Sequence, residues 1–135
     1  MKKYLQMPFS TREHMLSKDF ELFYYNDKHI TPLKEHSHDY YEFYFFLGGD
    51  VSIYIEGIKY ALKQGDMILI PPRLHHHVYV NRPDLPYQRI VFWISQKYYD
   101  SLLELSNDYG YLTKLVLSSR RYIYHYDLID FNTIQ

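Results

Sequence analysis

The stretch that decides the fold reads HSHDYYEFYFFLGGDVSIYIEGIKYALKQGDMILIPPRLHHHVYVN, from His36 to Asn81. It opens with His36 and His38, and Glu42 follows four residues after the second histidine. These three residues share parity, so an extended strand would point all three side chains to one face. Imidazole and carboxylate groups bind metals, and with a distant histidine added after a turn they would form an interior site in a small β-barrel.

Short apolar runs separated by turn residues indicate an all-β fold. Gly48 and Gly49 break the first aromatic run, and Pro71 ends a later strand. We expect one or two strands over residues 20–30, and single strands over 41–47, 51–55, 58–62, 67–70, 76–80 and 87–94. Short strands at regular spacing with turn residues between them are typical of a sandwich or a barrel.

The two halves of the quoted stretch resemble the paired motifs of the cupin superfamily, HxHxxxE followed by glycine, and GxxxxxPxGxxH. The amino-acid sequence of this region is most similar to the sensory domain at the N-terminus of AraC-type transcription regulators, over roughly residues 20–95. The resemblance implies a mainly β fold, a cupin-type double-stranded β-helix (jelly-roll barrel), followed by one or two C-terminal helices. One position departs from the motif. Arg73 replaces its second glycine, and we expect it to change the turn and to place a cation near the barrel mouth.

Three consecutive histidines follow the second motif's proline. His75, His76 and His77 cannot all face inward, because neighbours on a strand point to opposite faces. His76 holds the motif position counted from Pro71, whereas His77 holds the position counted back from Asn81. We expect His76 to be the inward residue.

The resemblance makes four residues a candidate metal site: His36, His38, Glu42 and His76. Three imidazoles and a carboxylate suit a divalent Zn, Ni, Mn or Fe ion and leave coordination positions open. The alternative is that these histidines only hydrogen-bond to one another, to water or to a ligand. Sensory domains of the resembled family usually keep some of these residues without using a metal for catalysis, so the resemblance implies no required cofactor.

An aromatic wall continues the face that carries Glu42. Tyr40, Tyr44 and Phe46 share its parity, and rings with a few polar tips are typical of a pocket for a sugar or another small polar ligand. For any single ring, plain core packing is the favoured alternative. We take seven residues as candidate ligand-binding residues: His36, His38, Glu42, Tyr44, His76, Arg73 and Trp93. We assign no catalytic residue.

Charge in this pocket would come from arginine. Arg89 shares parity with Trp93 on a late strand, and either Arg89 or Arg73 would serve as the counter-charge for an anionic ligand.

The pattern becomes helical after Ser95, which looks like an N-cap. Apolar residues then recur near helical spacing, and a second helix is expected over residues 111–117. The leucines of this region form an apolar stripe: Leu102, Leu103, Leu105, Leu112, Leu115 and Leu117. The stripe either packs on the outside of the barrel or joins two copies, and the resemblance favours a homodimer through these helices. Residues 120–135 return to a β-like aromatic pattern.

We divide the chain into an N-terminal arm (1–17), a cupin-like β-barrel (18–94) and a helical dimerisation segment that leads into a linker (95–135). The arm is unpatterned, as expected of a loose segment, and the resemblance also allows a ligand-gated arm. No helix-turn-helix pattern is found, so we expect DNA to be contacted only through units absent from this chain, which would make it a sensor domain or a truncated product.

Composition excludes several classes of protein. The formal net charge of −1 gives the chain no electrostatic grip on nucleic acid. The absence of cysteine excludes a disulfide framework and a thiolate metal site. No window approaches the ~18 consecutive apolar residues of a membrane span, and no signal peptide is recognised. A cytoplasmic location without membrane contact is expected.

The function expected from these features is that of an effector-sensing and dimerisation domain of an AraC-type regulator, with a small polar effector, such as a sugar, in the barrel. We expect no enzymatic activity, and no GxSxG, P-loop or GxGxxG motif is found. The alternative is a stand-alone metal-dependent cupin enzyme of the isomerase or dioxygenase type, because in such enzymes the metal performs the chemistry. A dimeric structural protein with a filled barrel is a third interpretation.

Overall fold

The chain folds into two antiparallel sheets followed by two helices and a short closing strand. The structure, a computed structural model, describes residues 15–30, 34–105 and 111–125. Its elements are β1 (Phe20–Asp27), β2 (Tyr41–Gly48), β3 (Val51–Ile55), β4 (Ile58–Ala61), β5 (Met67–Ile70), β6 (His76–Val80), β7 (Tyr87–Ile94), α2 (Gln96–Leu105), α3 (Tyr111–Ser119) and β8 (Ile123–Tyr124). The expected strands and both helices are present, with boundaries that differ by at most a few residues. The mainly β fold with helices after the barrel is confirmed.

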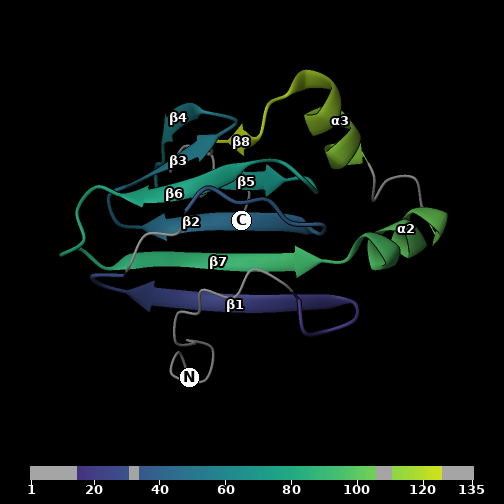
Figure 1. The fold of residues 1–135 in the computed structure, drawn as a ribbon, viewed down its shortest axis with the longest axis horizontal. Helices are drawn as coiled ribbons and strands as arrows, with labels where there is room; N and C mark the ends of the chain where they lie inside the picture. Colours follow the sequence, from purple (N-terminus) through teal and green to yellow (C-terminus); the bar gives the residue numbers. More distant parts are fainter. Residues whose placement is uncertain (1–14, 31–33, 106–110, 126–135) are drawn as a thin grey trace, which may run out of the picture.

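The larger sheet has the strand order β1-β7-β2-β5-β8, and the smaller sheet has the order β4-β3-β6. Figure 1 shows β1, β7 and β2 lying side by side and α2 following from the end of β7. All named pairings are antiparallel. An isolated bridge between His36 and His76 connects the segment before β2 to the start of β6. The candidate site therefore lies where the two sheets meet.

The core lies between the sheets, on the face that the shared parity of Glu42, Tyr44 and Phe46 predicts. All three are buried, and so are Arg89 and Trp93 on the neighbouring strand β7. The apolar core residues come from both sheets: Phe23, Tyr25, Tyr40, Tyr44, Phe46, Val51, Ile53, Ile55, Leu62, Ile68, Ile70, Val80, Tyr87, Val91, Trp93 and Ile123. Tertiary packing thus selects the inward face that the alternation in the sequence indicates.

The outer face of the larger sheet is uncharged. No Asp, Glu, Lys or Arg occupies an outward position on β1, β7, β2 or β5. Helix α2 covers one end of this face, where the rings of Tyr41 and Tyr99 lie 4.4 Å apart. Ser95 caps the helix, because its Oγ accepts a hydrogen bond from the Tyr98 amide at 3.1 Å. The expected N-cap is confirmed.

Strand β8 returns the chain to the larger sheet. It pairs with β5 through Met67↔Tyr124 and Ile68↔Ile123. This strand lies in the range that we assigned to a helical segment and the start of a linker, so part of that range contributes to the barrel. Residues 1–14 of the expected arm and residues 126–135 lie outside the described residues. Within the described part of the chain, no helix is both long enough and apolar enough to span a membrane.

Candidate metal and ligand site

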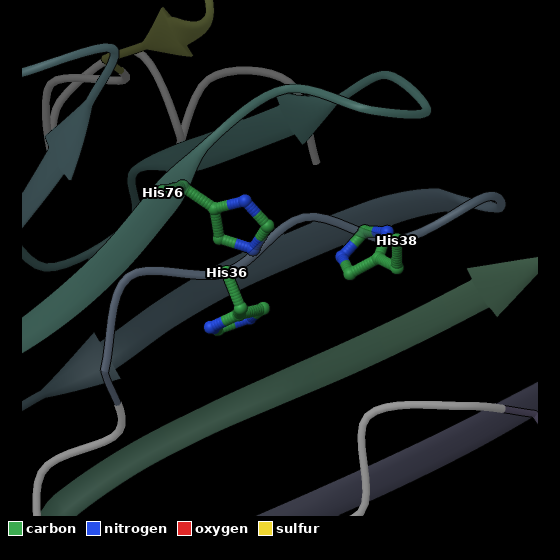
Figure 2. A group of neighbouring side chains, drawn as sticks. All are labelled: His36, His38 and His76. Atoms are coloured by element: carbon green, nitrogen blue, oxygen red, sulfur yellow. The ribbon is translucent and has the colours of Figure 1, made fainter.

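Three histidines from two segments of the chain meet inside the barrel. His36 and His38 come from the segment before β2, and His76 is the first residue of β6. One ring nitrogen from each lies within 4.8 Å of the others. Figure 2 shows the three rings gathered around a common space. The structure therefore brings together all three histidines that the sequence proposed.

Backbone carbonyls determine which nitrogen of each imidazole ring carries the hydrogen. The Nδ1 atoms of His36, His38 and His76 lie 2.9, 3.0 and 2.8 Å from the carbonyl oxygens of Lys34, Tyr40 and Leu74, respectively. A carbonyl oxygen only accepts hydrogen bonds, so Nδ1 carries the hydrogen in each ring. In the neutral rings, Nε2 is then left with a lone pair. Histidines that bind metals usually have this arrangement, in which the second nitrogen donates to an oxygen.

The Nε2 atoms fit a metal ion by their chemistry and their surroundings. Those of His38 and His76 are buried. The Nε2 of His76 has no hydrogen-bond partner among the described residues, and the Nε2 of His38 has only the Glu42 carboxylate near it, at 3.5 Å. A buried polar atom without a partner costs on the order of 1–3 kcal/mol. A divalent cation would satisfy these lone pairs together, so the residues present fit the metal that the three histidines suggest.

His76 is uncharged at neutral pH. Burial lowers the pKa of its imidazole from 6.5 to about 4, although the nearby Glu42 carboxylate and the hydrogen bond to the Leu74 carbonyl act in the opposite direction. The rings of His36 and His38 lower the pKa further when they carry charge. A neutral imidazole is the form that binds a metal, so burial prepares His76 for this role.

Glu42 lies beside the three histidines but outside the group of mutually close ligand atoms. Its Oε1 is 3.5 Å from His38 Nε2 and accepts a hydrogen bond from Trp93 Nε1 at 2.8 Å. Burial alone would raise the pKa of Glu42, but the polar contact with His38, the positive charge available on His76 and His38, and the Trp93 hydrogen bond lower it to about 2. Glu42 is therefore a carboxylate at ordinary pH, and it lies next to the three grouped histidines. The expected four-residue metal set stays a prediction.

Tyr44 faces the interior, as expected, and its hydroxyl forms a hydrogen bond with the hydroxyl of Tyr87. Burial raises the pKa of Tyr44 well above 10 and that of Tyr87 to about 12, so both remain neutral. Tyr87 was not among our candidates. Its parity with Arg89 and Trp93 on the same strand is the signal that would have found it.

Arg73 does not line this interior. Its side chain is exposed, and its backbone N–H donates to the His38 carbonyl at 2.6 Å. Its φ of 68° lies in the left-handed region that favours glycine. The arginine thus adopts the backbone conformation that a glycine adopts most easily, and our expectation of a changed turn stays a prediction.

Arg89 is buried, but its charge already has a partner. Its Nη1 lies 3.0 Å from Asp27 Oδ2, and its guanidinium stacks 4.6 Å from the Tyr25 ring centroid and 4.1 Å from that of Tyr87. No pattern in the sequence pointed to Asp27, since it lies on a strand distant in sequence. The expected counter-charge for an anionic ligand is thus neutralised within the protein.

The other two histidines of the triplet lie elsewhere. His75 is exposed, and the ring of His77 stacks on Tyr54 with centroids 4.5 Å apart. Since His76 is the one that joins His36 and His38, the position counted from Pro71 is the one the structure supports.

Comparisons with known proteins agree with this architecture. A family model described as the cupin domain matches residues 27–93, so the chain carries a cupin domain. A Cupin 2 conserved barrel domain protein from Salinispora arenicola is 24% identical, with 74% of this chain and 80% of that chain covered and a TM-score of 0.52. The plu4264 protein from Photorhabdus luminescens is 24% identical, with 70% and 79% covered and a TM-score of 0.53.

An enzyme also shares the fold. A mutant form of salicylate 1,2-dioxygenase from Pseudoaminobacter salicylatoxidans is 19% identical, with 56% of this chain and 22% of that chain covered and a TM-score of 0.50. At these identities the likeness to all three solved structures concerns the fold alone. No curated protein matches the chain.

Proposed function

We propose that the barrel binds a divalent transition metal through His36, His38 and His76 and, at that metal, a small polar ligand. The observation that carries this proposal is the orientation of the rings. Each Nδ1 donates to a backbone carbonyl, and one nitrogen from each ring lies within 4.8 Å of the others. Nitrogen ligands of this kind suit Zn, Ni, Mn or Fe. When bound, such an ion supplies a Lewis-acid centre with open coordination positions.

The measurement is isothermal titration of the full chain, produced without a polyhistidine tag and treated with a chelator, with Zn²⁺, Ni²⁺, Mn²⁺ and anaerobic Fe²⁺. We expect one tight site for at least one of these ions. His76→Ala should abolish it, whereas the exposed neighbour His75 provides the matched control, and His75→Ala should keep it. Equal loss in both variants, or the absence of any stoichiometric site in the unmodified chain, would reject the proposal.

The finer part of the proposal is that this ligand is the effector of a sensing and dimerisation domain of an AraC-type regulator in the cytoplasm. The resemblance of the paired motifs to that family supports it. The exposure of leucines on the two helices also supports it, because Leu105, Leu115 and Leu117 are 78%, 40% and 59% exposed. Exposed apolar residues on neighbouring helices suit a homodimer contact.

Sedimentation and ligand screening test the sensor role. We expect a dimer that Leu115→Ser with Leu117→Ser converts into a monomer, and a rise in Tm with at least one member of a panel of sugars and organic acids. Ser118→Ala, on the same helix, serves as the control for the double change. A monomer at all concentrations, or a dimer that no panel member stabilises, would count against an effector-sensing domain.

The second candidate is a metal-dependent cupin enzyme of the isomerase or dioxygenase type. The observation that favours it is the buried Glu42 carboxylate next to the three histidines, since a fixed carboxylate can accept a proton from a bound substrate. Oxygen uptake by the Fe²⁺-loaded chain with hydroxylated aromatic acids, and isomerisation of sugars by the Zn²⁺- or Mn²⁺-loaded chain, test this candidate. Activity that Glu42→Gln abolishes would favour it over the sensor, and inactivity on all of them would leave the sensor as the better explanation.

A further inference from the structure

Glu42 occupies a position from which it could join the three histidines, yet it is bonded to a different group. Its Oε1 accepts the indole hydrogen of Trp93 at 2.8 Å and lies 3.5 Å from His38 Nε2. The mutually close ligand atoms belong to the histidines alone among the described residues. The hydrogen bond to the indole is the shorter of the two polar contacts that this carboxylate makes, and the other is with His38.

We propose that Trp93 is a positioning residue that holds Glu42 as a hydrogen-bonded carboxylate beside the metal and prevents it from becoming a fourth ligand. The inference rests on the proposed function, since it requires that a metal binds to the three histidines. It assigns Glu42 a separate task, that of accepting a hydrogen bond from the ligand.

The sheet makes this hydrogen bond rigid. Glu42 on β2 and Trp93 on β7 are direct cross-strand partners, and both side chains face the interior. The indole ring is packed on two sides, with its centroid 4.8 Å from that of Phe23 and 4.8 Å from that of Tyr40. A hydrogen bond to a charged acceptor in a buried site is stronger than one between neutral groups. The indole cannot turn away without disturbing the core around it.

The position of the carboxylate also narrows the class of ligand. The buried cation Arg89 is paired with Asp27 at 3.0 Å, and it is not among the groups that shift the pKa of Glu42. The carboxylate of Glu42 instead lies beside His38. A carboxylate has about four acceptor positions, and those not used by Trp93 remain for ligand donors. The site therefore favours a ligand with hydroxyl groups over one whose only polar groups are anionic.

The chain contains a single tryptophan, which makes the contact directly observable. In a ¹H–¹⁵N spectrum the only indole N–H signal belongs to Trp93. We expect this signal to be shifted downfield and protected from solvent exchange in the metal-free protein. It should remain so after saturation with Zn²⁺, a diamagnetic ion. Glu42→Gln should move the signal upfield, whereas Glu104→Gln, an exposed change on α2, should leave it in place.

The response of the indole signal to Zn²⁺ distinguishes failure of this inference from failure of the proposed function. If Zn²⁺ binds and the indole signal moves to its position in Glu42→Gln, the carboxylate has left Trp93 for the metal and the inference is wrong. If Zn²⁺ does not bind to the unmodified chain, the proposed function fails and the inference fails with it.

Metal affinity provides a second readout. Trp93→Phe removes the donor but keeps an aromatic ring, so the released carboxylate should reach the metal and tighten Zn²⁺ binding by on the order of tenfold. The gain should disappear in the double variant Trp93→Phe with Glu42→Gln. An unchanged or weaker affinity in a folded Trp93→Phe protein would contradict the positioning role. If that variant does not fold, the spectrum of the unmodified chain still decides.

Discussion

His36 and His76 exchange two backbone hydrogen bonds across an isolated antiparallel bridge. The amide of His36 donates to the His76 carbonyl at 3.0 Å, and the amide of His76 donates to the His36 carbonyl at 2.9 Å. Their ring centroids consequently lie 4.4 Å apart. Two of the three candidate ligands are thus placed by the backbone before any metal arrives, so a metal would bind to an already folded site.

Metal binding should therefore raise thermal stability without changing secondary structure. At a free metal concentration one hundred times Kd, linkage predicts about 2.7 kcal/mol of added stability. For a domain of this size that corresponds to a rise in Tm of roughly 10 °C. Differential scanning calorimetry with Zn²⁺ and with a chelator measures the shift, and far-UV circular dichroism checks the structure. A large gain of β signal on adding metal would instead mean that the site forms only with the ion.

The stability of the metal-free protein should fall as the pH is lowered from 6.5 towards 4. Burial lowers the pKa of His76 from 6.5 to about 4, so in this interval the unfolded state binds a proton that the folded state does not. The stability is fully present above pH 6.5, and the loss reaches roughly 3 kcal/mol at 1.36 kcal/mol per pKa unit. Below pH 4.5 the carboxylate of Glu42, with a pKa of about 2, adds a further loss.

Urea unfolding of chelator-treated protein between pH 7.5 and 5 measures this dependence. His76→Gln should flatten the slope, because glutamine does not titrate, and His75→Gln should keep the slope of the unmodified chain. The same slope in all three proteins would show that His76 is not the group responsible.

Replacing Arg73 with glycine should stabilise the protein. Its φ of 68° is unfavourable for a side chain with a Cβ by about 1 kcal/mol or more. The greater freedom of glycine in the unfolded state offsets part of this gain. We expect a net increase of up to about 1 kcal/mol in the free energy of unfolding. Arg82→Gly, at an exposed position without a positive φ, should give no gain. A loss in Arg73→Gly would mean that the arginine side chain contributes more than the backbone strain.

The hydroxyls of Tyr44 and Tyr87 should behave as a coupled pair. Tyr44→Phe leaves the buried hydroxyl of Tyr87 without the hydrogen bond that it forms in the structure, at a cost of about 1–3 kcal/mol. Tyr87→Phe has the mirror effect. The double variant removes both polar groups and should be less destabilised than the sum of the single variants. A double-mutant cycle by urea unfolding measures the coupling, and strict additivity would contradict it.

Parity along a strand predicted much of the site. The alternation in residues 41–47 correctly placed Glu42 and Tyr44 on the interior face, and the spacing from Pro71 correctly selected His76. These successes depend only on the period of a β-strand, which a sequence displays directly. Most strand ends could also be predicted, because the turn residues and prolines that end the strands are visible in the sequence.

The remaining features depend on the pairing of distant segments. The contact of Arg89 with Asp27 follows from the register of β7 against β1, and that of Glu42 with Trp93 from the register of β2 against β7. A sequence shows which residues face inward but not which of them lie opposite one another. The direction of each imidazole hydrogen likewise depends on the local path of the backbone.

The pairing of β8 with β5 gives the helical region two attachment points on one sheet. Helix α2 continues directly from β7, and the segment after α3 ends in the strand that pairs with β5. Strands β7 and β5 are the two neighbours of β2, which carries Glu42. The helices are therefore fastened on both sides of the strand that holds the carboxylate. A change in the spacing of these three strands would alter the distance between the two attachment points. The helices on the outside of the barrel would then shift when the interior around Glu42 changes.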